Sequence, residues 1–101
     1  MSCNLTDIEQ LVSISRQMLL QARAAAWDDV TRLEKERHNL IGQLFSEPVE
    51  ESLVDSLSSG IKSVLAIDLD IIALGRVEKN ELEQTLRQIE QGKKARKAYD
   101  L

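Results

Sequence analysis

The chain has 101 residues, of which 43% are hydrophobic and 30% charged, so we expect residues 1–101 to form one soluble domain with its own core. One proline, four glycines and single tryptophan, tyrosine and phenylalanine residues favour long helices around an aliphatic core. The net charge of −4, the single cysteine and the lack of a long uncharged apolar run argue against nucleic-acid binding, a disulfide scaffold and membrane insertion, and indicate a cytoplasmic protein.

The first predicted helix covers residues 4–26. Thr6 and Glu9 have the spacing of a capping box, in which a hydroxyl and a carboxylate each accept a hydrogen bond from an amide at the helix start. Apolar residues recur at spacings of three and four residues or their sums, which gives the helix a wide apolar stripe. These residues are Ile8, Leu11, Met18, Ala22 and Ala25 in one row and Leu5, Val12, Leu19 and Ala26 in a second.

The second predicted helix follows Trp27, with Asp28 or Asp29 as its expected N-cap, and ends at Leu44 or Phe45. At the corner between the two helices, Trp27 is expected to cover the open end of the bundle. The apolar face of this helix consists of Val30, Leu33, Leu40, Ile41 and Leu44, and the aliphatic stem of Arg37 completes the row.

The clearest boundary in the chain lies at Ser46 and Pro48. Serine suits an N-cap, and proline suits the first turn of a helix because its missing amide hydrogen costs little there. From residue 49 to residue 97 the helical period continues, weakened only by Gly60 and Gly75. The remainder of the chain is therefore predicted to be helical.

This last segment has two interpretations. It is either one long helix that projects beyond the bundle, or two helices that break or kink between residues 66 and 70, where Asp68 could cap a fourth helix. The modest length of the first two helices favours the break. In both cases the expected fold is all-α, an antiparallel bundle of three to four helices with short connections.

The segment from residue 61 to residue 72 carries more apolar side chains than one helix face can hold. These side chains are Ile61, Leu65, Ile67, Leu69 and Ile72. Because they spread over more than half of the helix circumference, some of them must face a partner protein, a second copy of the chain or a bend. A surplus apolar face on a small acidic helical protein is typical of a module that binds another protein.

Groups that carry enzyme chemistry are nearly missing. The sequence contains no phosphate-binding loop, no dinucleotide-binding motif and no nucleophile elbow. His38 is the only histidine, and Glu34 one turn before it would need further ligands from elsewhere to hold a metal. Cys3, close to the start of the chain, has no histidine nearby to activate it. We therefore expect no enzyme, no cofactor, no metal and no small-molecule substrate.

The last residues combine a basic cluster with the single tyrosine. The cluster consists of Lys93, Lys94, Arg96 and Lys97. These cations are best explained as a solvated helix C-terminus, where they interact favourably with the helix dipole. Docking to a partner is the second explanation. Direct nucleic-acid binding is the third, because the rest of the chain is acidic and no aromatic residues are interleaved for base stacking. Tyr99 either packs back on the bundle or is an exposed binding anchor.

The order of these features resembles the FliT family of flagellar export chaperones, which protect the filament-cap protein before type III secretion. The resemblance covers nearly the whole chain but rests on scattered positions. They are Ala26-Trp27-Asp28 in a turn between two amphipathic helices, a proline-containing turn, Ile61-Lys62 with Leu65, a long charged helix, and Ala98-Tyr99.

The resemblance implies a small cytoplasmic helical chaperone that binds the C-terminal region of the filament-cap protein, holds it unpolymerised and brings it to the type III export apparatus. It also implies contacts with the export ATPase complex and with the flagellar master transcription regulator. The substrate-binding positions of the family match Ile61 and Leu65. The family's C-terminal tyrosine, implicated in docking to the membrane export gate, matches Tyr99. Together with Ile72 from the surplus apolar face, these are the predicted partner-binding residues.

A homodimeric helical adaptor without an export role is the alternative function. In that case the surplus apolar face is buried against a second copy of the chain. One feature fits neither function simply, because Asp68 and Asp70 lie within the same segment and a purely apolar contact surface would exclude their charges.

Overall fold

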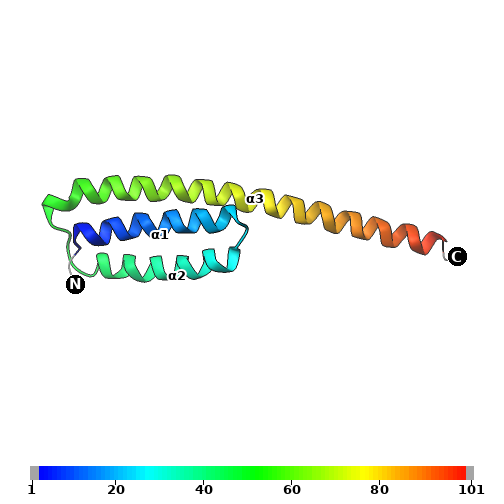
Figure 1. The fold of residues 1–101 in the computed structure, drawn as a ribbon, viewed down its shortest axis with the longest axis horizontal. Helices are drawn as coiled ribbons and strands as arrows, with labels where there is room; N and C mark the ends of the chain where they lie inside the picture. Colours follow the sequence, from blue (N-terminus) through cyan, green and yellow to red (C-terminus); the bar gives the residue numbers. More distant parts are fainter. Residues whose placement is uncertain (1–2, 100–101) are drawn as a thin grey trace.

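The computed structural model describes residues 3–99, with side chains described as far as Arg96, and these residues form three α-helices and one 3-10 turn. The elements are α1 (Leu5–Arg23), α2 (Trp27–Leu44), η1 (Glu51–Leu53) and α3 (Val54–Tyr99). Figure 1 shows that α2 runs antiparallel to α1 and that α3 returns along the other side of α1. The predicted all-α antiparallel bundle is confirmed.

The third helix runs without interruption over 46 residues. The break or kink favoured between residues 66 and 70, and the fourth helix after it, were wrong; the alternative of one long projecting helix is correct. Asp68 does not cap a helix, because its carboxylate accepts a hydrogen bond from Arg37 of α2 at 2.7 Å. Gly60 and Gly75 lie inside the helix, since a glycine lowers helix stability by only about 1 kcal/mol when packing supports the segment.

The start of α1 is capped by other residues than predicted. Asn4 is the N-cap: its side-chain oxygen accepts a hydrogen bond from the amide of Asp7 at 2.9 Å, and the Asp7 carboxylate accepts one from the amide of Asn4 at 3.4 Å. The capping box predicted at Thr6 and Glu9 was therefore wrong by two residues. The two pairs have the same spacing, and asparagine is a better N-cap than threonine.

The connection between α1 and α2 is a tight turn of alanines. Ala25 has a φ of 57°, in the left-handed region where a side chain costs free energy, and α1 ends at Arg23. The N-cap of α2 is Ala26, which offers no side-chain hydrogen bond. Asp28 and Asp29, the predicted caps, lie instead in the first turn of α2, where their charges interact favourably with the positive end of the helix dipole.

The connection from α2 to α3 is longer than predicted. Ser46 was expected to cap the third helix with Pro48 in its first turn, but both residues lie in the loop before η1. The Ser46 hydroxyl donates a hydrogen bond to the Gln43 carbonyl at 2.8 Å. Ser46 therefore interacts with the C-terminal end of α2 and does not cap the N-terminus of α3. The α-helical hydrogen bonds of α3 begin only at Val54, after the 3-10 turn.

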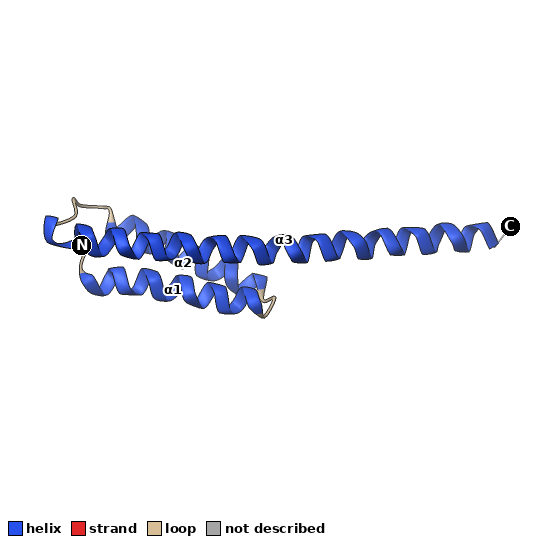
Figure 2. Cartoon of the chain, turned by 90° about the horizontal axis from the view of Figure 1, so that it is seen from above, coloured by secondary structure: helices blue, strands red, loops and turns tan. Residues whose placement is uncertain are grey.

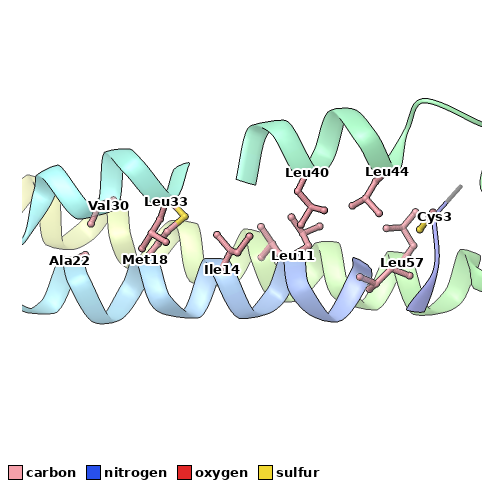
Figure 3. Close-up of a cluster of buried hydrophobic side chains, with 12 residues drawn as sticks. Cys3, Leu11, Ile14, Met18, Ala22, Val30, Leu33, Leu40, Leu44 and Leu57 are labelled. Carbon is pink, nitrogen blue, oxygen red and sulfur yellow. The ribbon is translucent and has the colours of Figure 1, made fainter. Parts of the chain in front are cut away.

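The core lies between the three helices and is aliphatic, with α1 in contact with both α2 and α3 (Figure 1). Figure 3 shows side chains of α1 and α2 pointing toward one another, with Leu57 of α3 beside them. The buried apolar residues are Cys3, Ile8, Leu11, Ile14, Met18, Ala22, Val30, Leu33, Leu40, Leu44, Leu57 and Val64.

The core reaches only along the first part of α3. Ile71 and Leu74 are the last residues of the helix that pack against it, and from Arg76 to Arg96 every side chain is exposed. We call residues 54–75 the proximal half of α3 and residues 76–99 the distal half. The distal half extends past the ends of α1 and α2, which makes the molecule 75 Å long and about 20 Å wide (Figure 2).

Candidate partner-binding surface

Besides Val54 at its start, the proximal half of α3 has three large apolar side chains that face away from the bundle. Leu65, Leu69 and Ile72 have exposed fractions of 58%, 68% and 49%. Their spacings of four and three residues put them on one face of the helix. We call these three residues the lateral patch. A contiguous exposed apolar surface of this kind on a small protein is characteristic of a binding site.

The lateral patch is exposed because the core occupies another face of the same helix segment. Leu57 and Val64 are buried and Ile71 packs half-buried against the core. At about 100° per residue, Leu65 is turned by about 100° from Val64. One straight helix cannot bury both rows against α1, so the surplus apolar face inferred from the sequence is present and lies open in the single chain.

The four predicted binding residues do not lie together. Leu65 and Ile72 belong to the lateral patch, whereas Ile61 is half-buried and packs against the core, so that only part of it is available to a partner. Tyr99 is the last residue of α3, and its side chain lies outside the described residues. The distal half of the helix separates it from the other three (Figure 2).

Leu69 was missed as a binding residue, although it is the most exposed member of the lateral patch. Its position four residues after Leu65 and three before Ile72 was the signal that could have identified it. It was recognised only as one of the surplus apolar residues. Its exposure makes it a cleaner probe of the surface than Ile61, whose replacement would also disturb the core.

The charge of Asp68 is accounted for by a polar contact that joins all three helices. Arg37 of α2 donates to the carboxylate of Asp68 on α3 at 2.7 Å and to the hydroxyl of Ser15 on α1 at 3.1 Å. Ser15 is fully buried and donates in turn to the Leu11 carbonyl at 3.0 Å. Asp68 is thus directed toward the bundle and paired, and its charge does not interrupt the lateral patch.

Asp70, the other unexpected charge, is exposed on a different side of α3. At about 100° per residue it lies about 100° around the helix from Leu69, and farther from Leu65 and Ile72. Asp70 therefore lies off the apolar contact surface, and Asp68 at the edge of that surface is paired with Arg37.

Trp27 lies where the bundle ends. It is half-buried and packs against the core, and a Cβ placed on Gly75 of α3 would lie 3.7 Å from the Cη2 atom of its indole. The predicted role of Trp27 in covering the end of the bundle is confirmed. Its Nε1 atom is buried and has no hydrogen-bond partner among the described residues. Its contribution here is packing rather than hydrogen bonding.

The remaining chemically reactive groups do not form a second kind of site. Burial, and to a smaller extent the charge of Asp7, raise the pKa of the Cys3 thiol above its ordinary value. Within residues 3–99, no group of histidine, cysteine, aspartate and glutamate side chains is placed to hold a metal ion. No described helix is both long enough and apolar enough to span a bilayer. The exposed apolar surface of α3 is therefore the candidate functional site.

Comparison with known proteins gives one match. The family model described as "FliT: Flagellar protein FliT" matches residues 5–101, which is nearly the whole chain. Neither a curated protein nor a solved structure matches the chain.

Proposed function

Because the chain belongs to the FliT family of flagellar export chaperones, as its sequence had indicated, we propose that it binds the filament-cap protein in the cytoplasm and delivers it to the type III export apparatus. In this proposal the client is the C-terminal region of the cap protein. The chaperone covers apolar client surface that would otherwise polymerise before export.

The observation that supports this proposal most strongly is the lateral patch. Leu65, Leu69 and Ile72 are each about half exposed or more, on a helix that the bundle holds rigidly from its other side. An amphipathic client helix placed along α3 would bury these side chains in one contact. Ile61 lies at the edge of the same surface and contributes its exposed part.

The proposed test is co-purification of the cap protein with variants of this chain. We expect Leu65→Glu and Leu69→Glu each to weaken the complex by at least about tenfold, since a buried uncompensated charge at the centre of an interface costs more than 1.4 kcal/mol. Helix content and thermal midpoint should stay unchanged, because both residues are exposed in the single chain.

Val77→Glu is the matched control for these variants. Val77 has an exposed fraction of 56% on the same helix and lies about 80° or more around it from every residue of the lateral patch. It should bind the cap protein as the unmodified chain does. Equal binding by all three variants would overturn the assignment of the site.

Delivery is proposed to involve the far end of α3. Tyr99 is the proposed contact with the membrane export gate, and the export ATPase complex is a further proposed partner. We expect Tyr99→Ala to leave cap-protein binding intact and to lower secretion of the cap protein from cells. Loss of both properties would instead indicate that Tyr99 supports the fold.

A contact with the flagellar master transcription regulator is a second proposed activity. A pull-down with purified regulator tests it directly, and no retention at concentrations that retain the cap protein would exclude it. The alternative function, a homodimeric adaptor without an export role, predicts that Leu65→Glu abolishes self-association and that the cap protein is not retained at all.

A further inference from the structure

Charged side chains are placed symmetrically around the lateral patch. Lys62 and Arg76 each lie seven residues from Leu69, the most exposed member of the patch, one on either side of it. Asp55 and Glu83 each lie 14 residues from Leu69, again one on either side. From both ends of this segment toward Leu69, the order is therefore an acidic residue, a basic residue and the leucine. The proposed chaperone function uses the apolar side chains and leaves this charge order without a role.

The seven-residue spacing puts these charges on the same side of α3 as the lateral patch. An α-helix drifts by about 20° per seven residues, so Lys62 and Arg76 are turned by about 20° from Leu69, and Asp55 and Glu83 by about 40°. At 1.5 Å per residue, the two cations lie about 10 Å from Leu69 along the helix axis and the two carboxylates about 21 Å from it. All four charged side chains are exposed.

The two cations beside the patch have no counter-charge. Neither Lys62 nor Arg76 forms an ion pair with any of the residues that the structure describes. Their own helix offers none, because the positions three and four residues away in both directions carry no carboxylate. An apolar patch with an unpaired cation at each end is complementary to a partner that has a carboxylate at each end of its own apolar row.

The neighbouring helix α2 does not neutralise these cations. Its Arg37 is paired with Asp68 at 2.7 Å, and the two side chains are 13% and 30% exposed, so this pair adds no net charge at the edge of the patch. Glu34, one turn from Arg37 on α2, is exposed and forms no ion pair with the described part of α3. The cations of α3 therefore stay available to a partner.

The remaining charges of α3 near the patch do not change this order. At about 100° per residue, Asp70 is turned by about 100° from Leu69 and Glu78 by about 180°, so both carboxylates point away from the face of the patch. Lys79 is turned by about 80° and lies one turn after Arg76, where it adds a further positive charge.

We infer that the lateral patch selects an amphipathic helix that carries a carboxylate seven residues before and seven residues after the apolar residue placed on Leu69. The two carboxylates of this helix face Lys62 and Arg76. Positions 14 residues from its centre are basic or uncharged, because Asp55 and Glu83 repel a further carboxylate there. The inference rests on the proposed function for the identity of the client, since this helix then belongs to the C-terminal region of the cap protein.

The symmetry of the charges makes this preference independent of the direction of the bound helix. Reversing that helix exchanges its two ends but leaves the distance of each carboxylate from the centre unchanged. A shift by seven residues is disfavoured, because it places one carboxylate on Leu69 and the other against Asp55 or Glu83. The apolar side chains therefore supply affinity, and the charges select the register of the client.

Two synthetic helical peptides of identical composition test the inference. Both carry the same leucine row. The first has glutamate seven residues and lysine 14 residues from the centre on both sides, and the second has these charges exchanged. At low salt we expect the unmodified chain to bind the first peptide at least about tenfold tighter in isothermal titration calorimetry, since several exposed charge pairs change sign together. The difference should shrink as salt increases. Equal affinities, tighter binding of the second peptide, or no binding of either would overturn the inference.

Charge reversal on the chain should reverse the preference. The double variant Lys62→Glu with Arg76→Glu should bind the second peptide more tightly than the first. Its helix content should stay unchanged, because both side chains are exposed. The matched control is Lys35→Glu, an exposed cation about 160° around α2 from Arg37, which should keep the preference of the unmodified chain. An unchanged preference in the double variant would contradict the inference.

Binding of the cap protein separates this inference from the chaperone function. We expect the double variant to retain the cap protein about tenfold more weakly than the unmodified chain does, and Lys35→Glu to retain it normally. Full retention by the double variant together with loss in Leu65→Glu would overturn the charge preference and leave the chaperone function standing. No retention even by the unmodified chain would contradict the chaperone function, while the two peptides would still decide the charge preference.

Discussion

The two halves of α3 have the same secondary structure and differ in what covers them. In the proximal half, Leu57 and Val64 are buried against the other helices; in the distal half, Leu82 and Ile89 are exposed on the continuation of the same row. The same apolar row with helical spacing is therefore buried in one part of the helix and exposed in another. The row is core where α1 and α2 run alongside it and is exposed where they end.

The two halves should also differ in stability. The proximal half gains its stability from tertiary packing, which most helices in proteins depend on. The distal half has only its own backbone hydrogen bonds and local side-chain pairs, each of which contributes about 0.2–0.5 kcal/mol. We expect it to open locally without unfolding of the bundle.

The largest expected difference is between replacing a core leucine and replacing a leucine of the distal half, and it concerns the free energy of unfolding. Leu11 is 2% exposed, so Leu11→Ala should lower the free energy of unfolding by about 2–5 kcal/mol because a cavity remains. Leu86→Ala on the distal half should change it by less than about 0.5 kcal/mol at concentrations where the chain is monomeric. Urea denaturation of both variants measures the difference. Similar losses would mean that the distal half is part of the cooperative core.

A smaller effect is expected at the polar contact that joins the helices. Arg37→Ala removes the partner of Asp68 and Ser15 and should cost about 1–3 kcal/mol. The matched control is Arg32→Ala. Arg32 forms an ion pair with Glu36 at 3.2 Å, but the two side chains are 60% and 53% exposed. Loss of this ion pair should therefore lower the free energy of unfolding by no more than about 1 kcal/mol. Equal losses in thermal unfolding would contradict a structural role for the Arg37 contact.

The smallest effects on stability are expected from replacing glycine by alanine, and they should have opposite signs in the two halves of α3. In Gly60→Ala the new Cβ would lie 2.9 Å from Cγ2 of the buried Ile8, so the packing of α1 on α3 must shift and stability should fall. In Gly92→Ala nothing lies within 4 Å, and the distal helix should gain up to about 1 kcal/mol locally. Circular dichroism during thermal unfolding measures both. A stabilising Gly60→Ala would show that α1 and α3 approach less closely than described.

Much of the fold could be predicted because it depends on local periodicity. The predicted rows through Ile8 and Leu11 in α1 and through Val30 and Leu33 in α2 are part of the core. Three of the five surplus apolar residues between 61 and 72 form the lateral patch. Periodicity reports how many faces of a helix are apolar. It does not report which face meets a partner within the same chain.

The errors arose where tertiary contacts decide between local alternatives. Asp68 is a reasonable cap by residue type, but a charge-assisted hydrogen bond from Arg37 keeps it inside a continuous helix. Ser15 is fully buried and accepts a hydrogen bond from Arg37 of α2, a contact that the periodicity of α1 does not reveal. The Asn4 and Thr6 pairs have equal spacing, so spacing alone does not decide between them, and only the higher N-cap preference of asparagine favours Asn4.

Hydrogen exchange along α3 tests most directly the claim that the other helices stabilise its proximal half and leave its distal half exposed. At a concentration where the chain is monomeric, we expect amides of residues 60–74 to exchange only through global unfolding, and those of residues 78–96 to exchange at least about a hundredfold faster through local opening. Uniform protection along all of α3 in the monomer would contradict the account.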